Sequence, residues 1–184
     1  MDAFDSTFLT FLFVPNAPCA VERARERVDY LIGGIHGSGD RIVIPAPALS
    51  ELLIGVGHSR KQILHELAHN PKFLIAPFDT RAALELSLMA GDFLKRTGKK
   101  KGDAGGTWAK VKFDWQIVAV AKVCNVSTIY SEDPDIRKLA TSSDMKIKGV
   151  GDLPLPHKPH RGETLFDMAR KEDASEDNDG KNKR

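Results

Sequence analysis

Two kinds of hydrophobic pattern alternate along the chain. Short runs rich in β-branched residues are typical of buried strands, and apolar residues spaced three and four positions apart are typical of amphipathic helices. The runs predict a first strand that ends at Asp5 and later strands over 41–44, 72–76, 127–130 and 146–150. The helical spacing predicts helices over 6–13, 20–35, 47–54, 60–69, 80–94, 111–123 and 134–141. We expect the second helix to end at a series of glycines, namely Gly33, Gly34, Gly37 and Gly39.

Strands that alternate with helices predict an α/β fold with a parallel sheet. Because crossovers between parallel strands are right-handed, helices cover both faces of the sheet, and the result is a three-layer α/β/α sandwich. We expect a central, mainly parallel sheet of four or five strands. In open sheets of this kind ligands bind outside the carboxyl ends of the strands, so candidate chemistry is sought there.

The composition narrows the possible classes of protein. Of 184 residues, 41% are hydrophobic and 28% are charged, which suffices for a buried core and excludes a wholly disordered chain. The chain has 27 Lys and Arg against 25 Asp and Glu, a balance that excludes a histone-like polycation. No apolar run approaches the roughly 18–20 residues of a membrane span, and the first residues do not resemble a signal peptide. With only Cys19 and Cys124, the sequence favours a reduced, cytoplasmic protein.

The end of the chain differs in character from the rest. Residues 157–184 contain seven Lys and Arg and seven Asp and Glu, and the last ten residues have no apolar side chain. Such a segment buries too little to offset the entropy lost on ordering. We therefore expect a folded domain over 1–156 and a flexible polar tail over 157–184.

Acidic residues follow the predicted strands or lie on the helices next to them. Asp5 follows the first strand, Glu51 lies on the helix after the second, and Asp114 lies near the start of a helix. Asp133 follows the strand that ends at residue 130, with Asp135 two positions on. Each acid alone is typical of a helix N-cap or a solvated surface. Together they would repel one another unless cations neutralised them, and an all-oxygen ligand set favours Mg²⁺ or Mn²⁺.

The order of these motifs resembles a PIN domain. Four motifs carry the resemblance: Asp5-Ser6-Thr7, Ser50-Glu51-Leu52-Leu53, the helix from Asp114 to Ala121, and Ser131-Glu132-Asp133-Pro134-Asp135. Two further segments resemble the bacterial VapC-type toxins, namely Pro77-Phe78-Asp79-Thr80 and 151–156. The resemblance covers residues 1–156. Each motif alone is weak, but the ordered set is specific.

The resemblance implies a metal-dependent endoribonuclease that hydrolyses RNA phosphodiester bonds with Mg²⁺ or Mn²⁺, as the toxin of a type II toxin–antitoxin pair. By position it implies that Asp5, Glu51, Asp114 and Asp133 form the catalytic and metal-binding quartet. The implied partners are RNA, an antitoxin protein and a second copy of the chain in a homodimer.

The resemblance also implies accessory residues near the quartet. Asp135 is a further metal ligand, and Ser131 supports the acids through hydrogen bonds, as does either Ser6 or Thr7. The first strand is unusually short, because Asp5 lies only four residues after the start. Asp2 is therefore an alternative to Asp5 as the first acid.

A basic segment precedes Asp114. Residues 95–112 contain seven Lys or Arg and one Asp. Cations beside an acidic metal site can neutralise phosphates, so this segment is either an RNA contact or a solvated loop. The candidate RNA-binding residues are Lys99, Lys100, Lys101 and Lys112.

Two other functions stay open from the sequence. One is a noncatalytic RNA-binding or assembly module on the same fold, although all the acids are present. The other is a zinc metalloprotease, since His65-Glu66-Leu67-Ala68-His69 matches the H-E-x-x-H pattern of two zinc ligands and a base. The helix ends at once at Asn70-Pro71 and no third ligand is evident, which makes the protease the weaker reading.

Overall fold

A computed structural model describes residues 1–14, 16–97, 108–140 and 145–156. The strands are β1 (Asp2–Phe4), β2 (Ile42–Pro45), β3 (Phe73–Ala76), β4 (Thr128–Tyr130) and β5 (Lys146–Lys148). The helices are α1 (Ser6–Phe13), α2 (Ala24–Ser38), α3 (Ala46–Gly55), α4 (Arg60–His69), α5 (Thr80–Thr97), α6 (Trp108–Val123) and α7 (Pro134–Ala140). Two short 3₁₀ helices are η1 (Gly57–Ser59) and η2 (Val150–Asp152). The proposed tail over 157–184 lies outside the described residues.

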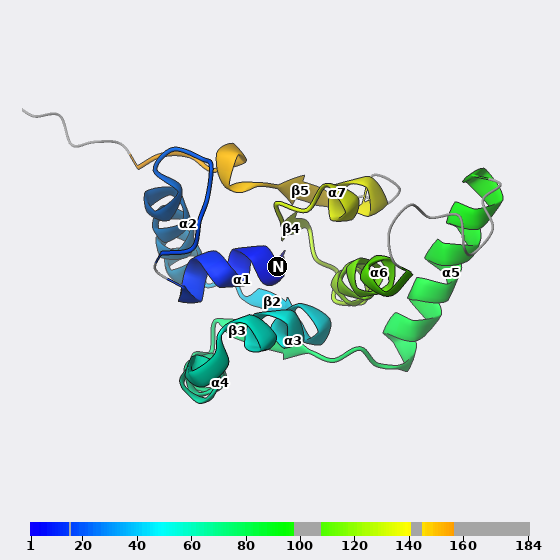
Figure 1. Cartoon of the computed structure of the whole chain (residues 1–184), viewed down its shortest axis with the longest axis horizontal. Coiled ribbons are helices and arrows are strands. Elements are labelled where there is room, and N and C mark those ends of the chain that lie inside the picture. The colour runs from blue at the N-terminus through cyan, green and yellow to red at the C-terminus, as the bar shows by residue number, and fades with distance from the viewer. Residues whose placement is uncertain (15, 98–107, 141–144, 157–184) are drawn as a thin grey trace, which may run out of the picture.

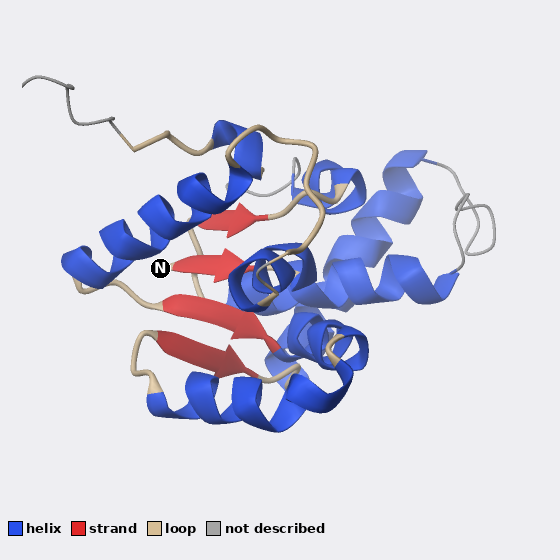
Figure 2. Cartoon of the chain, turned by 60° about the vertical axis from the view of Figure 1, so that its left-hand side comes forward, coloured by secondary structure: helices blue, strands red, loops and turns tan. Residues whose placement is uncertain are grey.

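The strands form one sheet in the order β3-β2-β1-β4-β5, and every pairing is parallel. Helices flank the sheet, with α1 and α2 on one side and α5 and α6 on the other (Figure 1). Figure 2 displays strands of the sheet side by side, pointing the same way between the helices. The predicted α/β/α sandwich is confirmed, and its sheet has five strands, within the predicted range of four or five.

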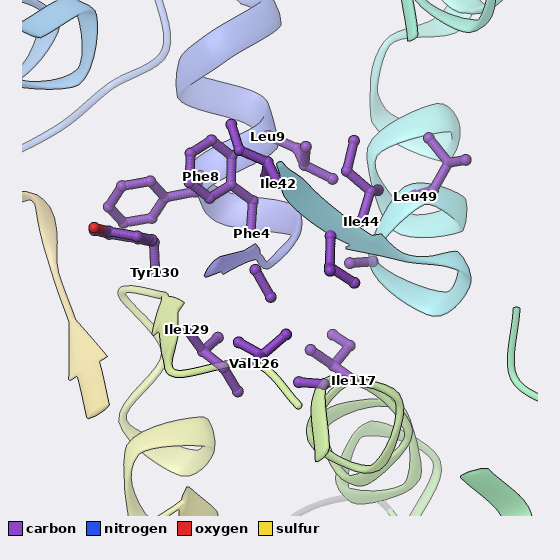
Figure 3. Close-up of a cluster of buried hydrophobic side chains, with 14 of the residues drawn as sticks. Phe4, Phe8, Leu9, Ile42, Ile44, Leu49, Ile117, Val126, Ile129 and Tyr130 are labelled. Carbon is purple, nitrogen blue, oxygen red and sulfur yellow. The ribbon is translucent and has the colours of Figure 1, made fainter. Parts of the chain in front are cut away.

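The buried centre of the molecule is where β1 and β4 pair. Phe4 of β1 lies edge-on to Tyr130 of β4, with ring centroids 5.4 Å apart, and Phe8 of α1 packs on both rings (Figure 3). Ile129 and Ile117, both buried, bring β4 and α6 into the same cluster. This packing fixes the carboxyl ends of β1 and β4, which Asp5 and Ser131 directly follow.

The second helix differs from the sequence prediction at both ends. It begins at Ala24 rather than residue 20, because Arg23 adopts a left-handed conformation (φ 55°) that helical geometry does not allow. It continues through three of the four glycines that we expected to end it. Gly39, with φ 79°, terminates it, since a left-handed residue after the last turn is the usual helix stop.

The strand order creates a switch point beside β1. The chain adds β2 and β3 on one side of β1 and then returns to add β4 and β5 on the other. Connections leaving the two neighbouring strands β1 and β4 therefore diverge at their carboxyl ends, and a crevice forms there. Asp5 follows β1 directly, and Ser131 and Asp133 follow β4, so all three lie at the switch point.

Candidate metal centre

Asp5 is held in place by the start of α1. It is the N-cap residue, and its Oδ1 accepts a hydrogen bond of 2.9 Å from the backbone N–H of Phe8. Its other oxygen, Oδ2, accepts a hydrogen bond of 2.5 Å from the hydroxyl of Ser131. Asp5 and Ser131 are both 1% exposed. The carboxylate of Asp5 therefore caps α1 and also contacts Ser131 in the candidate site.

The segment after β4 is ordered by hydrogen bonds among its own residues. The hydroxyl of Ser131 accepts a bond of 3.0 Å from the backbone N–H of Asp133 while donating to Asp5. Asp133 Oδ1 accepts from the backbone N–H of Asp135 at 2.7 Å, which caps the start of α7. Ser131 thus links the two acids that follow β1 and β4.

Three carboxylates from this edge approach one another closely. One oxygen each from Asp114, Asp133 and Asp135 lies within 4.8 Å of the others. Asp114 lies on α6 and is buried, whereas Asp133 and Asp135 are half-buried. Lys138 forms an ion pair of 2.9 Å with Asp135, so one of the three charges is partly balanced within α7.

A cavity of about 560 Å³ opens beside Asp114 and Asp133. Its lining includes Asp5 and Ser6 of the β1–α1 junction, Glu51 of α3, Asp114 of α6 and Asp133. Apolar side chains line it as well, and we call these its apolar wall: Phe11, Pro18, Ile54 and Ile136 together with neighbouring side chains. Acids from four separate parts of the chain therefore share one open space.

Burial gives Asp5 an unusual proton affinity. Desolvation raises the pKa of its carboxyl to about 7, and the nearby charge of Asp133 adds to the increase. Hydrogen bonds from Ser131 and from the backbone amides of Phe8 and Thr7 act in the opposite direction. A cation beside Asp5 would favour its ionised form, because an opposite charge lowers a carboxyl pKa.

The donor set fits a hard divalent cation. Within the described part of the chain, the one group of three metal-capable side chains is Asp114, Asp133 and Asp135, and every donor in it is a carboxylate oxygen. Mg²⁺ and Mn²⁺ prefer such ligands, whereas zinc sites use mainly His and Cys.

Solved structures with the same arrangement of elements include bacterial toxins. VapBC2 from Rickettsia felis, bound to a DNA fragment from its promoter, matches with a TM-score of 0.53 and 13% identity over 80% of this chain and 97% of that chain. The chain has a VapC-like PIN-domain fold. DNA-bound VapBC from Salmonella typhimurium matches with a TM-score of 0.52 and 15% identity, over 81% of this chain and 97% of that one.

A third matching structure is that of a toxin that cleaves the sarcin–ricin loop. VapC20 from Mycobacterium tuberculosis, a sarcin–ricin loop cleaving toxin, aligns with a TM-score of 0.52 and 12% identity over 79% of this chain and 99% of that chain. Identities this low establish the fold alone. No family model matches the sequence, and no curated protein matches it.

The PIN-like fold brings the predicted quartet together only in part. Asp5, Glu51, Asp114 and Asp133 all line the one cavity, but the group within 4.8 Å contains Asp135 and neither Asp5 nor Glu51. Ser6 also lines the cavity, and its backbone carbonyl accepts a hydrogen bond from the hydroxyl of Thr10.

Asp2, the alternative first acid, lies elsewhere on β1. It pairs with Ile42 and Thr128 at the amino end of the sheet. Its carboxylate accepts hydrogen bonds from the hydroxyls of Ser127 and Tyr130. The geometry therefore favours Asp5.

Of the four lysines predicted to contact RNA, the structure describes one. Lys99, Lys100 and Lys101 lie outside the described residues, and Lys112 lies on α6, two residues before Asp114. Their contact with RNA stays a prediction. Within the described ranges every helix is too short or too polar to cross a membrane.

The sequence did not indicate two features of the site. The apolar wall, above all Ile54 with 74% of its surface exposed, comes from residues that read as ordinary helix positions. Glu132 accepts a hydrogen bond from the backbone N–H of Val150, a partner 18 residues away. A backbone amide leaves no side-chain signature, so sequence patterns could not reveal this contact.

Proposed function

We propose that the protein is a metal-dependent endoribonuclease that uses Mg²⁺ or Mn²⁺ to hydrolyse RNA phosphodiester bonds. The observation that carries the proposal is the approach of three carboxylates to within 4.8 Å at the switch point of a PIN-like sheet. Acids so placed repel one another, and a bound cation turns this repulsion into attraction.

The residues have distinct tasks in this proposal. Asp114, Asp133 and Asp135 bind the cation, and Asp5 and Glu51 extend the negative surface along the cavity that receives the phosphate. The cation supplies Lewis acidity, which activates water for attack and neutralises charge on the phosphate. Burial raises the pKa of Asp5 in the metal-free protein, and a bound cation would favour its ionised form.

We further propose that the chain acts as a toxin restrained by an antitoxin. Two of the structures with this fold, VapBC2 and VapBC, are complexes, which supports such a partner. The cavity combines acids with an apolar wall that includes the exposed Ile54. A partner segment with a basic and an apolar side chain would fit it. A homodimer and cytoplasmic location stay predictions from the sequence.

Asp114→Asn tests the catalytic proposal. We expect it to lower RNA cleavage at least 100-fold, because one carboxylate of the cation site becomes a neutral amide, while the folded state persists. The measurement is cleavage of structured and unstructured RNA in Mg²⁺ and in Mn²⁺, with EDTA as the metal-free reference. In a bacterial host, expression of the wild type should arrest growth and expression of the variant should not.

Asp92→Asn is the matched control, since Asp92 is an exposed acid on α5 outside the cavity. It should cleave RNA like the wild type. Full activity of Asp114→Asn in Mg²⁺, or wild-type cleavage that continues in EDTA, would contradict the proposal.

A further inference from the structure

We propose that Glu132 is a positioning residue for the metal centre. Its carboxylate, bound to the backbone amide of Val150, fixes the short segment that carries Asp133. The inference rests on the proposed metal-dependent function, because it concerns the geometry of the same cluster.

The first support is the contact between Glu132 and Val150. Oε1 of Glu132 accepts a hydrogen bond from the N–H at the start of η2, and Val150 itself is fully buried. The hydrogen bond is part-buried, since the Glu132 side chain is exposed, and it holds the carboxylate at the N–H of Val150. Glu132 lies between Ser131 and Asp133, and its anchor therefore acts on both neighbours.

The second support is the absence of a side chain at position 149. A Cβ built on Gly149 would lie 2.9 Å from Oε1 of Glu132, closer than real Cβ atoms approach. Gly149 has an extended backbone (φ −88°, ψ 174°), which any residue can adopt. A methyl group at position 149 would therefore push the Glu132 carboxylate, the end of an exposed side chain, out of this position, whereas the backbone conformation itself does not require glycine.

The anchor point is itself well fixed. The N–H of Gly149 donates a 2.8 Å hydrogen bond to Asp152, and the guanidinium of Arg27 donates to the carbonyl of Leu153. On the other side, the N–H of Ser131 donates to the carbonyl of Lys148 at 2.9 Å. The β4 exit is thus tied to the β5 exit by one backbone bond and by one side-chain bond, that of Glu132.

The consequence for the cluster is twofold. The side-chain bond limits movement of the segment from which Asp133 reaches Asp114 and Asp135. It also holds the Glu132 carboxylate against residues 149 and 150, so that it does not add a further negative charge to the three acids. Groups that orient metal ligands typically change metal affinity or activity 10- to 100-fold when removed.

The contact can be broken from either side, which gives a sharp test. Glu132→Ala removes the acceptor, and Gly149→Ala leaves the acceptor but displaces it with a new methyl group. Glu132→Gln keeps an acceptor oxygen and is the conservative control. We would measure Mn²⁺ affinity by calorimetry without RNA, then kcat and KM for RNA cleavage, with thermal unfolding to confirm folding.

We expect Glu132→Ala and Gly149→Ala each to weaken Mn²⁺ binding about tenfold and to lower kcat more than they change KM. Glu132→Gln should stay within about threefold of the wild type. The double variant Glu132→Ala/Gly149→Ala should be no worse than either single variant, because both changes break one contact.

Wild-type Mn²⁺ affinity in folded Glu132→Ala and Gly149→Ala would overturn the inference, as would additive losses in the double variant. Absence of Mn²⁺ binding by the wild type would overturn it too. If the wild type binds Mn²⁺ and the variants weaken it, but no RNA is cleaved, the positioning role stands and the proposed ribonuclease function fails.

Discussion

The acidic edge of the sheet and the exposed face of α4 both carry residues that bind metals in other proteins, yet they are built differently. At the acidic edge, Asp114 comes from α6 and Asp133 and Asp135 from the β4–α7 junction. The three carboxylates lie close together, and Asp114 and Asp133 line a cavity. On α4, His65 and His69 come from successive turns of one helix and are exposed to solvent.

The hydrogen bonds differ as well. Nδ1 of His69 lies 2.8 Å from the backbone carbonyl of His65, and the two rings lie against each other with centroids 4.0 Å apart. Glu66 accepts a hydrogen bond from Gln62 one turn earlier. Each of these contacts stays within α4, whereas Ser131 donates to Asp5, 126 residues away in sequence. Ligands that converge from separate elements are therefore a better indication of a metal centre than the spacing of two residues on one helix.

Ser131→Ala is the prediction with the largest expected effect among those that probe this convergence. The substitution removes the hydroxyl that donates to Asp5 and accepts from the N–H of Asp133. We expect RNA cleavage and Mn²⁺ affinity to fall 10- to 100-fold, because both acids lose their shared support. Metal titration and cleavage kinetics measure the effect.

Ser131→Thr keeps the hydroxyl and is the matched control for this prediction. It should retain cleavage within about threefold of the wild type. If Ser131→Ala also behaves like the wild type, the link between Asp5 and Asp133 has no functional role.

Asp5→Asn tests whether the buried carboxyl of Asp5 makes the stability of the folded protein depend on pH. The pKa of Asp5 is raised from 3.8 to about 7, so the folded state holds a proton that the unfolded chain releases between these pH values. The metal-free wild type therefore loses stability as pH rises from about 4 to 7, and the loss is complete above that range. The amide of Asn never ionises and avoids this loss.

We expect metal-free Asp5→Asn to melt about 3 °C or more above the wild type at pH 8. A tenfold change in proton affinity corresponds to about 1.4 kcal/mol, and 1 kcal/mol moves the melting temperature by about 2–4 °C at this size. At pH 5 the difference should shrink, because wild-type Asp5 is then largely protonated. A gain that is the same at both pH values would show that Asp5 is ionised throughout.

Much of the fold follows from the sequence because local patterns decide it. Apolar runs such as Ile42-Val43-Ile44 and Thr128-Ile129-Tyr130 form buried parallel strands, and Asp79 caps α5 as expected, with its Oδ1 accepting from the N–H of Ala82 at 3.0 Å. The ends of α2 were less predictable, since the left-handed conformation of Arg23 depends on its surroundings rather than on its side chain.

The sequence predicted which edge of the sheet carries the candidate site, but not the detailed arrangement of its acids. The order of strands and helices placed Asp5, Glu51, Asp114 and Asp133 near the carboxyl ends of the strands, and the PIN-domain resemblance implied their roles as a quartet. It did not indicate that the group within 4.8 Å would contain Asp135 and neither Asp5 nor Glu51. Tertiary contacts, such as the anchor between Glu132 and Val150, decide such details, and they join residues that no local pattern connects.

His65→Ala/His69→Ala is the prediction with the smallest expected effect, and it tests the other side of the comparison. Because both imidazoles are exposed and their contacts stay within α4, we expect the double variant to cleave RNA within about twofold of the wild type in Mg²⁺ and Mn²⁺. Its melting temperature should also change little, since exposed positions away from special contacts contribute little to stability. Metal analysis of the purified wild type completes the test. Stoichiometric zinc that is lost in the double variant, together with loss of activity, would make α4 a functional metal site and reverse the comparison.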